Sequence, residues 1–143
     1  MIHRALSGLE GEKCRLLKMS RLYETRPWGV QEQPSFLNAA AVALSSLEPV
    51  QLLRKLKKME RELGRIQRQR WGPREIDIDL LLYGEEVLDL PDLKIPHPEM
   101  HRRAFVLVPL AEIAGEWIHP VLGQCVRDLA QAVCDRNDIR PVT

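Results

Sequence analysis

Apolar and polar residues alternate one by one in the middle of the chain. Residues 76–83 read Ile-Asp-Ile-Asp-Leu-Leu-Leu-Tyr, so two aspartates fall between apolar positions. This period of two predicts a β-strand whose isoleucines turn towards the core. Asp77 and Asp79 would then project from one face of the strand, about 7 Å apart along it.

A helical spacing begins at Pro49, after which apolar residues recur every three to four positions. Such a stripe predicts an amphipathic helix, and proline is well tolerated at its first position. Gly64 favours a helix end, so the basic residues 65–74 are expected to form a loop. The other expected elements are the end of a helix at 2–9, strands at 16–23, 36–45 and 87–90, a loop at 25–34, an extended segment at 95–98, and helices at about 99–114 and 124–134.

Strands and helices are mixed along the chain and joined by hairpin-length connections. This order predicts an α+β fold in which helices cover a mainly antiparallel sheet. The length of 143 residues and the hydrophobic share of 45% suit a single domain with one core. No internal repeat or low-complexity linker divides residues 1–143, so we expect one domain.

The three cysteines, Cys14, Cys125 and Cys134, are widely spaced and form no Cys-x-x-Cys pair. Their spacing argues against a disulfide framework or a zinc site, and for a reducing compartment. The sequence contains no apolar run of membrane-spanning length and no secretory signal pattern. A cytoplasmic location and no membrane partner are therefore expected.

Charge is balanced overall but divided locally. The formal net charge is +1, which gives no global attraction to nucleic acid or membranes. Residues 51–74 carry nine Lys/Arg and two Glu, a balance of +7, whereas residues 75–99 carry eight Asp/Glu and one Lys, a balance of −7. A basic block beside an acidic block suits a metal–polyphosphate site, and it also occurs in ordinary surface pairing. A third interpretation is a nucleic-acid surface on residues 51–74.

Asp77 and Asp79 are candidate metal ligands. Two like charges on one half-buried face repel each other unless a cation lies between them. Mg²⁺ suits this position, since it takes one or two carboxylates and leaves other coordination positions for water and phosphate oxygens. The alternative is a solvated strand face. Aspartate is disfavoured in strands, so two of them between isoleucines favour a functional interpretation.

Arginines supply candidate phosphate ligands before this strand. Arg65, Arg68, Arg70 and Arg74 lie within ten residues, and the planar guanidinium binds phosphate oxygens. For most of them a solvated basic surface is the simpler interpretation. Arg74 is favoured for function because it follows a proline and lies three residues before the first aspartate. Trp71 could shield a nucleotide or cap the core. Neither a Rossmann nor a P-loop glycine motif is present.

The remaining candidates are one histidine and two phenylalanines. His97 lies between two prolines, so its ring has restricted freedom and could contact phosphate or form a structural hydrogen bond. Phe36 and Phe105 lie near Asn38 and Arg103, respectively. Two aromatic rings can sandwich a flat heterocycle while an amide binds its edge. On the residues alone, a core position is favoured for both phenylalanines.

Several motifs occur together in an order that resembles a known family. They are Leu22-Tyr-Glu-Thr-Arg-Pro-Trp-Gly29, Gln33-Pro-Ser-Phe-Leu-Asn-Ala-Ala40, Leu63-Gly-Arg65, Arg70-Trp-Gly-Pro-Arg-Glu-Ile-Asp-Ile-Asp-Leu-Leu82, Ile95-Pro-His97 and Arg103-Ala-Phe-Val-Leu-Val-Pro-Leu110. Together they resemble the 6-hydroxymethyl-7,8-dihydropterin pyrophosphokinase family of folate biosynthesis. The resemblance covers essentially the whole chain.

The resemblance implies a ferredoxin-like α+β fold and a diphosphate transfer. ATP would give its β,γ-diphosphate to the hydroxymethyl group of 6-hydroxymethyl-7,8-dihydropterin and release AMP, with two Mg²⁺ ions. Both substrates are small molecules, and no nucleic-acid partner is implied. The implied catalytic residues are Arg65, Arg74, Asp77 and Asp79; Asp77 and Asp79 would bind metal; Leu53, Glu60, Arg65, Trp71, Arg74, Leu80, His97 and Arg103 would bind ATP; and Thr25, Trp28, Phe36, Asn38 and Phe105 would bind pterin.

The chain departs from the family at its start. Family members open with a strand and a Gly-Ser-Asn turn, and neither precedes the first helix here. We expect either a longer natural protein with a misassigned start codon, or a truncated remnant that binds pterin or nucleotide without turnover. The absent strand would leave unpaired backbone groups within the sheet and remove part of the core. Gln67 also stands where many members carry a basic residue, and Arg68 is a candidate substitute.

Overall fold

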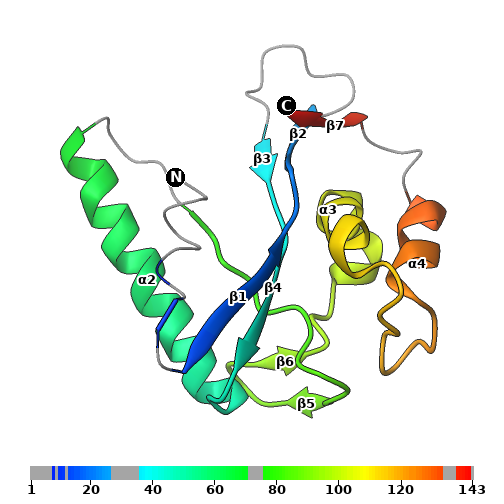
Figure 1. Cartoon of the computed structure of the whole chain (residues 1–143), viewed down its shortest axis with the longest axis horizontal. Helices are drawn as coiled ribbons and strands as arrows, with labels where there is room; N and C mark the ends of the chain where they lie inside the picture. Colours follow the sequence, from blue (N-terminus) through cyan, green and yellow to red (C-terminus); the bar gives the residue numbers. More distant parts are fainter. Residues whose placement is uncertain are drawn as a thin grey trace.

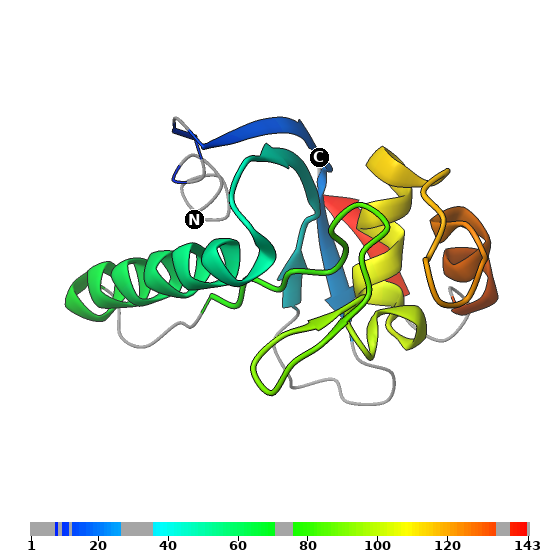
Figure 2. The ribbon, with the colours of Figure 1, turned by 90° about the horizontal axis from the view of Figure 1, so that it is seen from below.

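The computed structural model describes residues 8, 10, 11, 13–26, 36–70, 76–133 and 138–142, leaving aside the side chains of residues 26, 36, 65–70 and 138. The elements are β1 (Cys14–Met19), β2 (Leu22–Arg26), β3 (Phe36–Asn38), β4 (Ala41–Ser45), α2 (Pro49–Arg70), β5 (Leu88–Asp89), β6 (Lys94–Ile95), the 3₁₀ turn η1 (Met100–Arg102), α3 (Ala104–Ala114), α4 (Val126–Val133) and β7 (Asp138–Val142). Helix α2 lies at one end of the molecule and α3 and α4 at the other, with the strands between them (Figures 1 and 2). The predicted ferredoxin-like α+β class is confirmed, and the described strand pairs are all antiparallel.

Strands β1 to β4 form one long, twisted hairpin. Strand β1 pairs with β4 and β2 pairs with β3, so the two arms run side by side (Figure 1). The register shifts by one residue between Leu16 and Lys18. A second shift follows Met19, because Met19 pairs with Ala41 whereas Tyr23 pairs with Asn38. Each shift places an extra residue on the first arm, which bends the strand and increases its twist.

The two strands expected at 16–23 and 36–45 are each interrupted. At the interruption, Ser20 donates its backbone N–H to Ala40 O at 2.8 Å, and Ala40 N–H is bound by Ser20 Oγ at 2.9 Å. A serine hydroxyl thus replaces a backbone carbonyl in the ladder. The hydrophobic pattern gives no sign that a side-chain hydroxyl takes the place of a backbone acceptor. The sequence therefore predicted continuous strands.

Helix α2 begins at Pro49 as expected but continues past Gly64 to Arg70. The predicted end at Gly64 is therefore wrong, as is the predicted loop for residues 65–70. A glycine inside a helix costs about 1 kcal/mol relative to alanine, while arginine and glutamine are good helix formers. The residues that follow Gly64 are dominated by these two types, and they outweigh its cost.

Residues 76–83 are assigned to no strand in the described structure, so the strand predicted from their alternation is wrong. The alternation of exposure is nevertheless present. Asp77 and Asp79 are exposed, and Ile76 and Ile78 are half-buried. Alternation of apolar and polar residues indicates which side chains are covered. A β-strand also requires hydrogen bonds to a neighbouring strand.

The C-terminal elements follow the sequence more closely. The short strand expected at 87–90 is β5, which pairs with β6. The helix expected at about 99–114 is divided into η1 and α3, since Arg103 between them is extended, with φ −111° and ψ 104°. Helix α4 lies within the expected range 124–134. Strand β7, which pairs with β2, was not predicted. Residues 27–34 and almost all of 2–9 lie outside the described residues.

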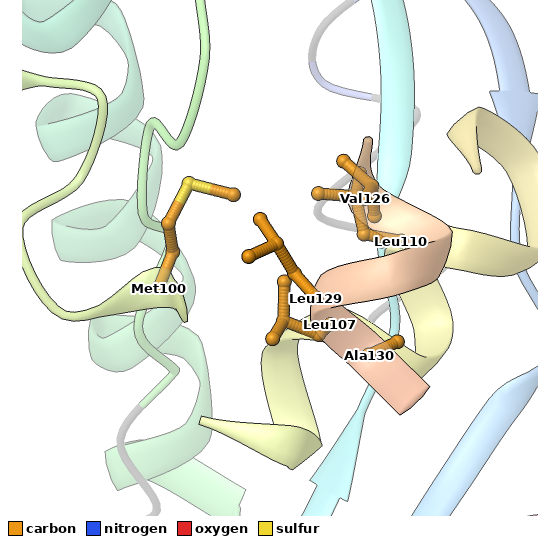
Figure 3. Packing of buried hydrophobic residues seen from close by; sticks show 7 residues of the cluster. Met100, Leu107, Leu110, Val126, Leu129 and Ala130 are labelled. Atoms are coloured by element: carbon orange, nitrogen blue, oxygen red, sulfur yellow. The ribbon is translucent and has the colours of Figure 1, made fainter. Parts of the chain in front are cut away.

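Two apolar clusters support the fold. The helical core joins η1, α3 and α4, and its buried members are Ala40, Met100, Leu107, Leu110, Val126, Leu129 and Ala130. Figure 3 shows side chains from these three elements converging. The α2 cluster consists of Cys14, Leu52, Leu56 and Met59, with partly buried neighbours that include Ile78 and Leu80. Among the helices of the described part, none combines the length and apolar character needed to span a membrane.

Candidate active site

A cavity of about 800 Å³ lies between β4 and residues 76–84. Its walls are mostly apolar and come from both clusters, with Leu56 and Met59 of α2 on one side and Leu110 of α3 on the other. A mostly apolar cavity of this volume suits a small-molecule ligand with a few polar groups. Five residues that the sequence singled out line this cavity: Thr25, Asn38, Asp77, Asp79 and Phe105.

The two aspartates form the acidic side of the cavity. Asp77 and Asp79 are both exposed, so their carboxylates are accessible to a ligand. The backbone between them is held by α2, because Ile78 N–H donates to Glu60 Oε1 at 2.6 Å. Two carboxylates on one short segment fit Mg²⁺, which completes its coordination with water and substrate phosphates.

Within the described ranges, no group of three or more His, Cys, Asp or Glu side chains is placed to hold a metal ion. An ion at Asp77 and Asp79 would therefore take further ligands from substrate or water. This donor set differs from the four-ligand cage of a structural zinc site.

Phe105 supplies an aromatic ring to the cavity wall, and Arg103 lies against that ring. Phe105 is half-buried and lines the cavity, so the core position favoured from the residues alone is wrong for it. The guanidinium carbon of Arg103 lies 5.8 Å from the centre of the Phe105 ring. This cation–π contact brings a positive charge next to a ring that can stack on a heterocycle.

Thr25 also lines the cavity and carries a buried hydroxyl. The residue is 6% exposed, and its Oγ1 has no hydrogen-bond partner among the groups that the structure describes. A buried hydroxyl without a partner is costly, so a ligand that hydrogen-bonds to it would gain by doing so. Asn38 on β3 adds an amide with both donor and acceptor groups.

A hydrogen-bond network fixes α3 against β2, the two elements that carry Phe105 and Thr25. Glu112 Oε1 accepts from Arg21 Nε at 2.8 Å and from Tyr23 OH at 2.6 Å. Desolvation works to raise the pKa of Glu112, but these hydrogen bonds outweigh it and lower that pKa overall. Burial, followed by the bond to Glu112, raises the pKa of Tyr23. The network therefore stays in its bonded form at neutral pH.

His97 lies beside the cavity segment and makes structural hydrogen bonds. Its backbone N–H donates to Leu81 O at 2.9 Å, and its Nδ1 accepts from Glu99 N–H at 3.1 Å. The structural alternative expected for this histidine is thus present. Since Nδ1 accepts, a neutral ring would carry its proton on Nε2.

The sequence matches the family described as 7,8-dihydro-6-hydroxymethylpterin-pyrophosphokinase over residues 1–115. The chain belongs to this family. It is 48% identical over 120 residues to the 2-amino-4-hydroxy-6-hydroxymethyldihydropteridine pyrophosphokinase of Aquifex aeolicus strain VF5, covering 84% of this chain and 74% of that protein. It is 39% identical over 140 residues to the protein of the same name in Haemophilus influenzae, covering 97% and 87% of the two chains.

A longer relative also matches. The folic acid synthesis protein fol1 of Pneumocystis carinii is 42% identical over 138 residues, which is 96% of this chain but 18% of that protein. This chain therefore corresponds to one part of a larger polypeptide there.

The structure does not bring every expected residue of the pyrophosphokinase site to the cavity. Glu60 accepts a hydrogen bond from Ile78 N–H and does not line the cavity, and Leu80 packs against the α2 cluster. Leu53 is half-buried on α2. Trp28, Trp71 and Arg74 lie outside the described residues, as do the side chains of Phe36, Arg65, Arg68 and Arg70.

Trp117 is a cavity residue that the sequence did not single out. It follows α3, lines the cavity, and its Nε1–H donates to Gly84 O at 3.3 Å. This bond ties the end of α3 to the turn after residues 76–83. Trp117 has no motif or periodic pattern around it, so only the fold reveals its position at the cavity.

Proposed function

We propose that this chain transfers the β,γ-diphosphate of ATP to the hydroxymethyl group of 6-hydroxymethyl-7,8-dihydropterin, and that it does so at the cavity between β4 and residues 76–84. The proposal rests on one observation above the others. In a chain of the pyrophosphokinase family, a single cavity is lined both by a pair of exposed carboxylates and by an aromatic ring, an amide and a buried hydroxyl. The first set suits a metal-bound polyphosphate and the second suits a flat heterocycle.

The reaction is an in-line displacement at phosphorus. The pterin hydroxyl oxygen forms a bond to the β-phosphorus of ATP, the bond from that phosphorus to the α,β-bridging oxygen breaks, and AMP leaves with the oxygen. The hydroxyl proton passes to solvent or to a phosphate oxygen. Positioning and charge neutralisation supply most of the catalysis in such a transfer, so no side chain need act as a general base.

Asp77 and Asp79 would hold Mg²⁺, with two ions expected. The bound metal would neutralise charge on the phosphates. Arg103 adds a cation next to the same cavity, and the described neighbours of Asp77 and Asp79 leave their carboxylates exposed for this role.

Three of the cavity residues would each make a contact with the pterin. Phe105 would stack on the ring, Asn38 would hydrogen-bond to its edge, and the Thr25 hydroxyl would gain the partner that it lacks in the described structure. A pterin offers donors and acceptors along one edge, which suits both an amide and a hydroxyl. We also propose a cytoplasmic site of action, supported by the free thiols of Cys14 and Cys125.

The direct test is AMP release from ATP by the 143-residue chain, with and without the dihydropterin and with and without Mg²⁺. The expected result is AMP formation that requires both, with one pterin diphosphate formed per AMP. A folded chain that forms no AMP under these conditions would contradict the proposal. Such a chain would favour the alternative of a binding remnant, which a pterin-binding titration would then identify.

A further inference from the structure

Glu60 of α2 contacts the backbone between the two aspartates of the cavity. Its Oε1 accepts the hydrogen bond from Ile78 N–H at 2.6 Å. Its Oε2 lies 3.5 Å from Lys57 Nζ, and 17% of the Glu60 side chain is exposed. The carboxylate is therefore partly enclosed, with one oxygen directed at the peptide between Asp77 and Asp79.

This contact matters because residues 76–83 have no strand pairing in the described structure. In a sheet, a ladder of backbone hydrogen bonds would fix the direction of every second side chain. Here, two contacts from other elements act on the backbone instead. Glu60 binds the amide of Ile78, and the amide of His97 binds the carbonyl of Leu81 at 2.9 Å. The first of these contacts lies between the two aspartates.

We propose that Glu60 is a positioning residue, which fixes the Ile78 peptide and thereby sets the relative placement of Asp77 and Asp79 for a magnesium–polyphosphate ligand. The inference rests on the proposed function. It gives Glu60 a role that acts through the metal-binding segment, different from the nucleotide contact that the resemblance implies. Groups that orient metal ligands typically change metal affinity about 10- to 100-fold when they are removed.

The test uses two substitutions at Glu60 and one control. Glu60→Ala removes the acceptor, whereas Glu60→Gln keeps an oxygen that can accept from Ile78 N–H but removes the charge. Glu62→Ala, two residues further along the same helix and exposed, removes the same charge without touching residues 76–83.

The first measurement is amide hydrogen exchange in the protein without metal or nucleotide. Glu60→Ala is expected to accelerate exchange at Ile78 and to leave Leu129 in the helical core unchanged. Glu60→Gln and Glu62→Ala are expected to resemble the wild-type protein at both positions. Unchanged exchange at Ile78 in Glu60→Ala would overturn the proposal, because the contact would then not hold this peptide.

The second measurement is a Mg²⁺ titration in the presence of α,β-methylene-ATP, followed by NMR at Asp77 and Asp79. Glu60→Ala is expected to weaken Mg²⁺ binding about tenfold, and Glu60→Gln by less than about threefold. In the AMP assay, the Mg²⁺ concentration for half-maximal rate is expected to rise in the same proportion. The control Glu62→Ala is expected to match wild type.

Three further results would overturn the proposal. Glu60→Ala could lose protection at Ile78 yet bind Mg²⁺ normally, which would leave the contact without effect on the metal ligands. Glu60→Gln could be as impaired as Glu60→Ala, which would assign the effect to charge. Glu60→Ala could raise the KM for ATP while the Mg²⁺ concentration for half-maximal rate stays unchanged, which would make Glu60 a nucleotide contact. If wild type forms no AMP, the proposed function fails, and the exchange and titration still decide the role of Glu60.

Discussion

The helical core and the cavity differ in how completely their side chains are covered. Met100, Leu107 and Val126 in the helical core are fully buried, and they pack against one another across three elements (Figure 3). Around the cavity, Asp77 and Asp79 are exposed and the Thr25 hydroxyl has no described partner. The difference indicates that the two regions have different functions. The helical core stabilises the fold. The cavity has polar groups that remain available to bind a ligand.

The largest expected effect compares one leucine from each apolar cluster. Leu107→Ala should cost about 3–5 kcal/mol of unfolding free energy, because a fully enclosed side chain leaves a new cavity. Leu56→Ala should cost about 2–3 kcal/mol, since Leu56 already borders the existing cavity and leaves less new empty volume. Urea denaturation followed by circular dichroism measures both values. Equal losses, or a larger loss at Leu56, would remove the distinction between the two regions.

The next effect separates activity from stability. Asp77→Asn and Asp79→Asn should each reduce AMP formation about 100-fold or more if the carboxylates hold metal. Their denaturation midpoints should change little, because exposed substitutions are usually within about 0.5 kcal/mol. Asp92→Asn, an exposed aspartate outside the cavity lining, is the matched control. Variants that fold and retain near-normal rates would show that the metal assignment is wrong.

Two tyrosine hydroxyls give a smaller effect on the two sides of the molecule. Tyr23 OH donates to the carboxylate of Glu112 at 2.6 Å, and Tyr83 OH donates to the carbonyl of Leu47 at 2.5 Å. Hydrogen bonds to charged groups are worth about 1.5–3 kcal/mol and those between neutral groups about 1 kcal/mol. Tyr23→Phe should therefore destabilise more than Tyr83→Phe in the same denaturation experiment. The reverse order would mean that Glu112 does not anchor α3 to β2.

Thr25 allows stability and binding to change in opposite directions. Thr25→Val removes a buried hydroxyl without a described partner, so the free protein should be unchanged or more stable by up to about 1 kcal/mol. The KM for the dihydropterin should rise, because a hydrogen bond to the ligand is lost. Thr25→Ser keeps the hydroxyl and should restore the wild-type KM. A valine variant that loses stability and keeps its KM would contradict the assignment.

The smallest effect is a pH dependence in the loop that precedes α4. Burial, with a contribution from His101, lowers the pKa of His119, and its Nδ1 accepts from the N–H groups of Val121 and Leu122. The unfolded state therefore binds a proton more readily, so stability is full above about pH 6.5 and falls as pH drops towards the lower folded pKa. Denaturation of wild type and His119→Asn across pH 5–8 measures the effect. An unchanged slope in the variant would exclude His119 as its source.

Much of the α+β fold could be predicted from hydrophobic spacing. The start of α2, the position of α4 and the strand content of residues 16–23 and 36–45 follow from local periodicity and from the position of Pro49. Strand β7 could not be predicted, since its sequence Asp-Ile-Arg-Pro-Val has no clear alternation and it forms by pairing with β2. The end of α2 was missed because a single glycine was given more weight than the helix formers after it.

The candidate site was predictable in part, for a different reason. The alternation predicted aspartates and isoleucines on opposite faces, and the observed exposure alternates in that way, but strand pairing is absent in the described structure. The pterin-side residues depended on the family resemblance, because nothing in the spacing of Thr25, Asn38 and Phe105 indicates that they meet. Trp117 reaches the cavity only through the packing of α3, so local sequence carries no signal for it.

The most direct measurement is an NMR titration with 6-hydroxymethyl-7,8-dihydropterin in the presence of Mg²⁺ and α,β-methylene-ATP. We predict chemical-shift changes centred on Thr25, Asn38 and Phe105, with Leu129 and Ala130 of the helical core unaffected. Changes centred on α4, with none at the three cavity residues, would contradict the assignment of the cavity as the active site.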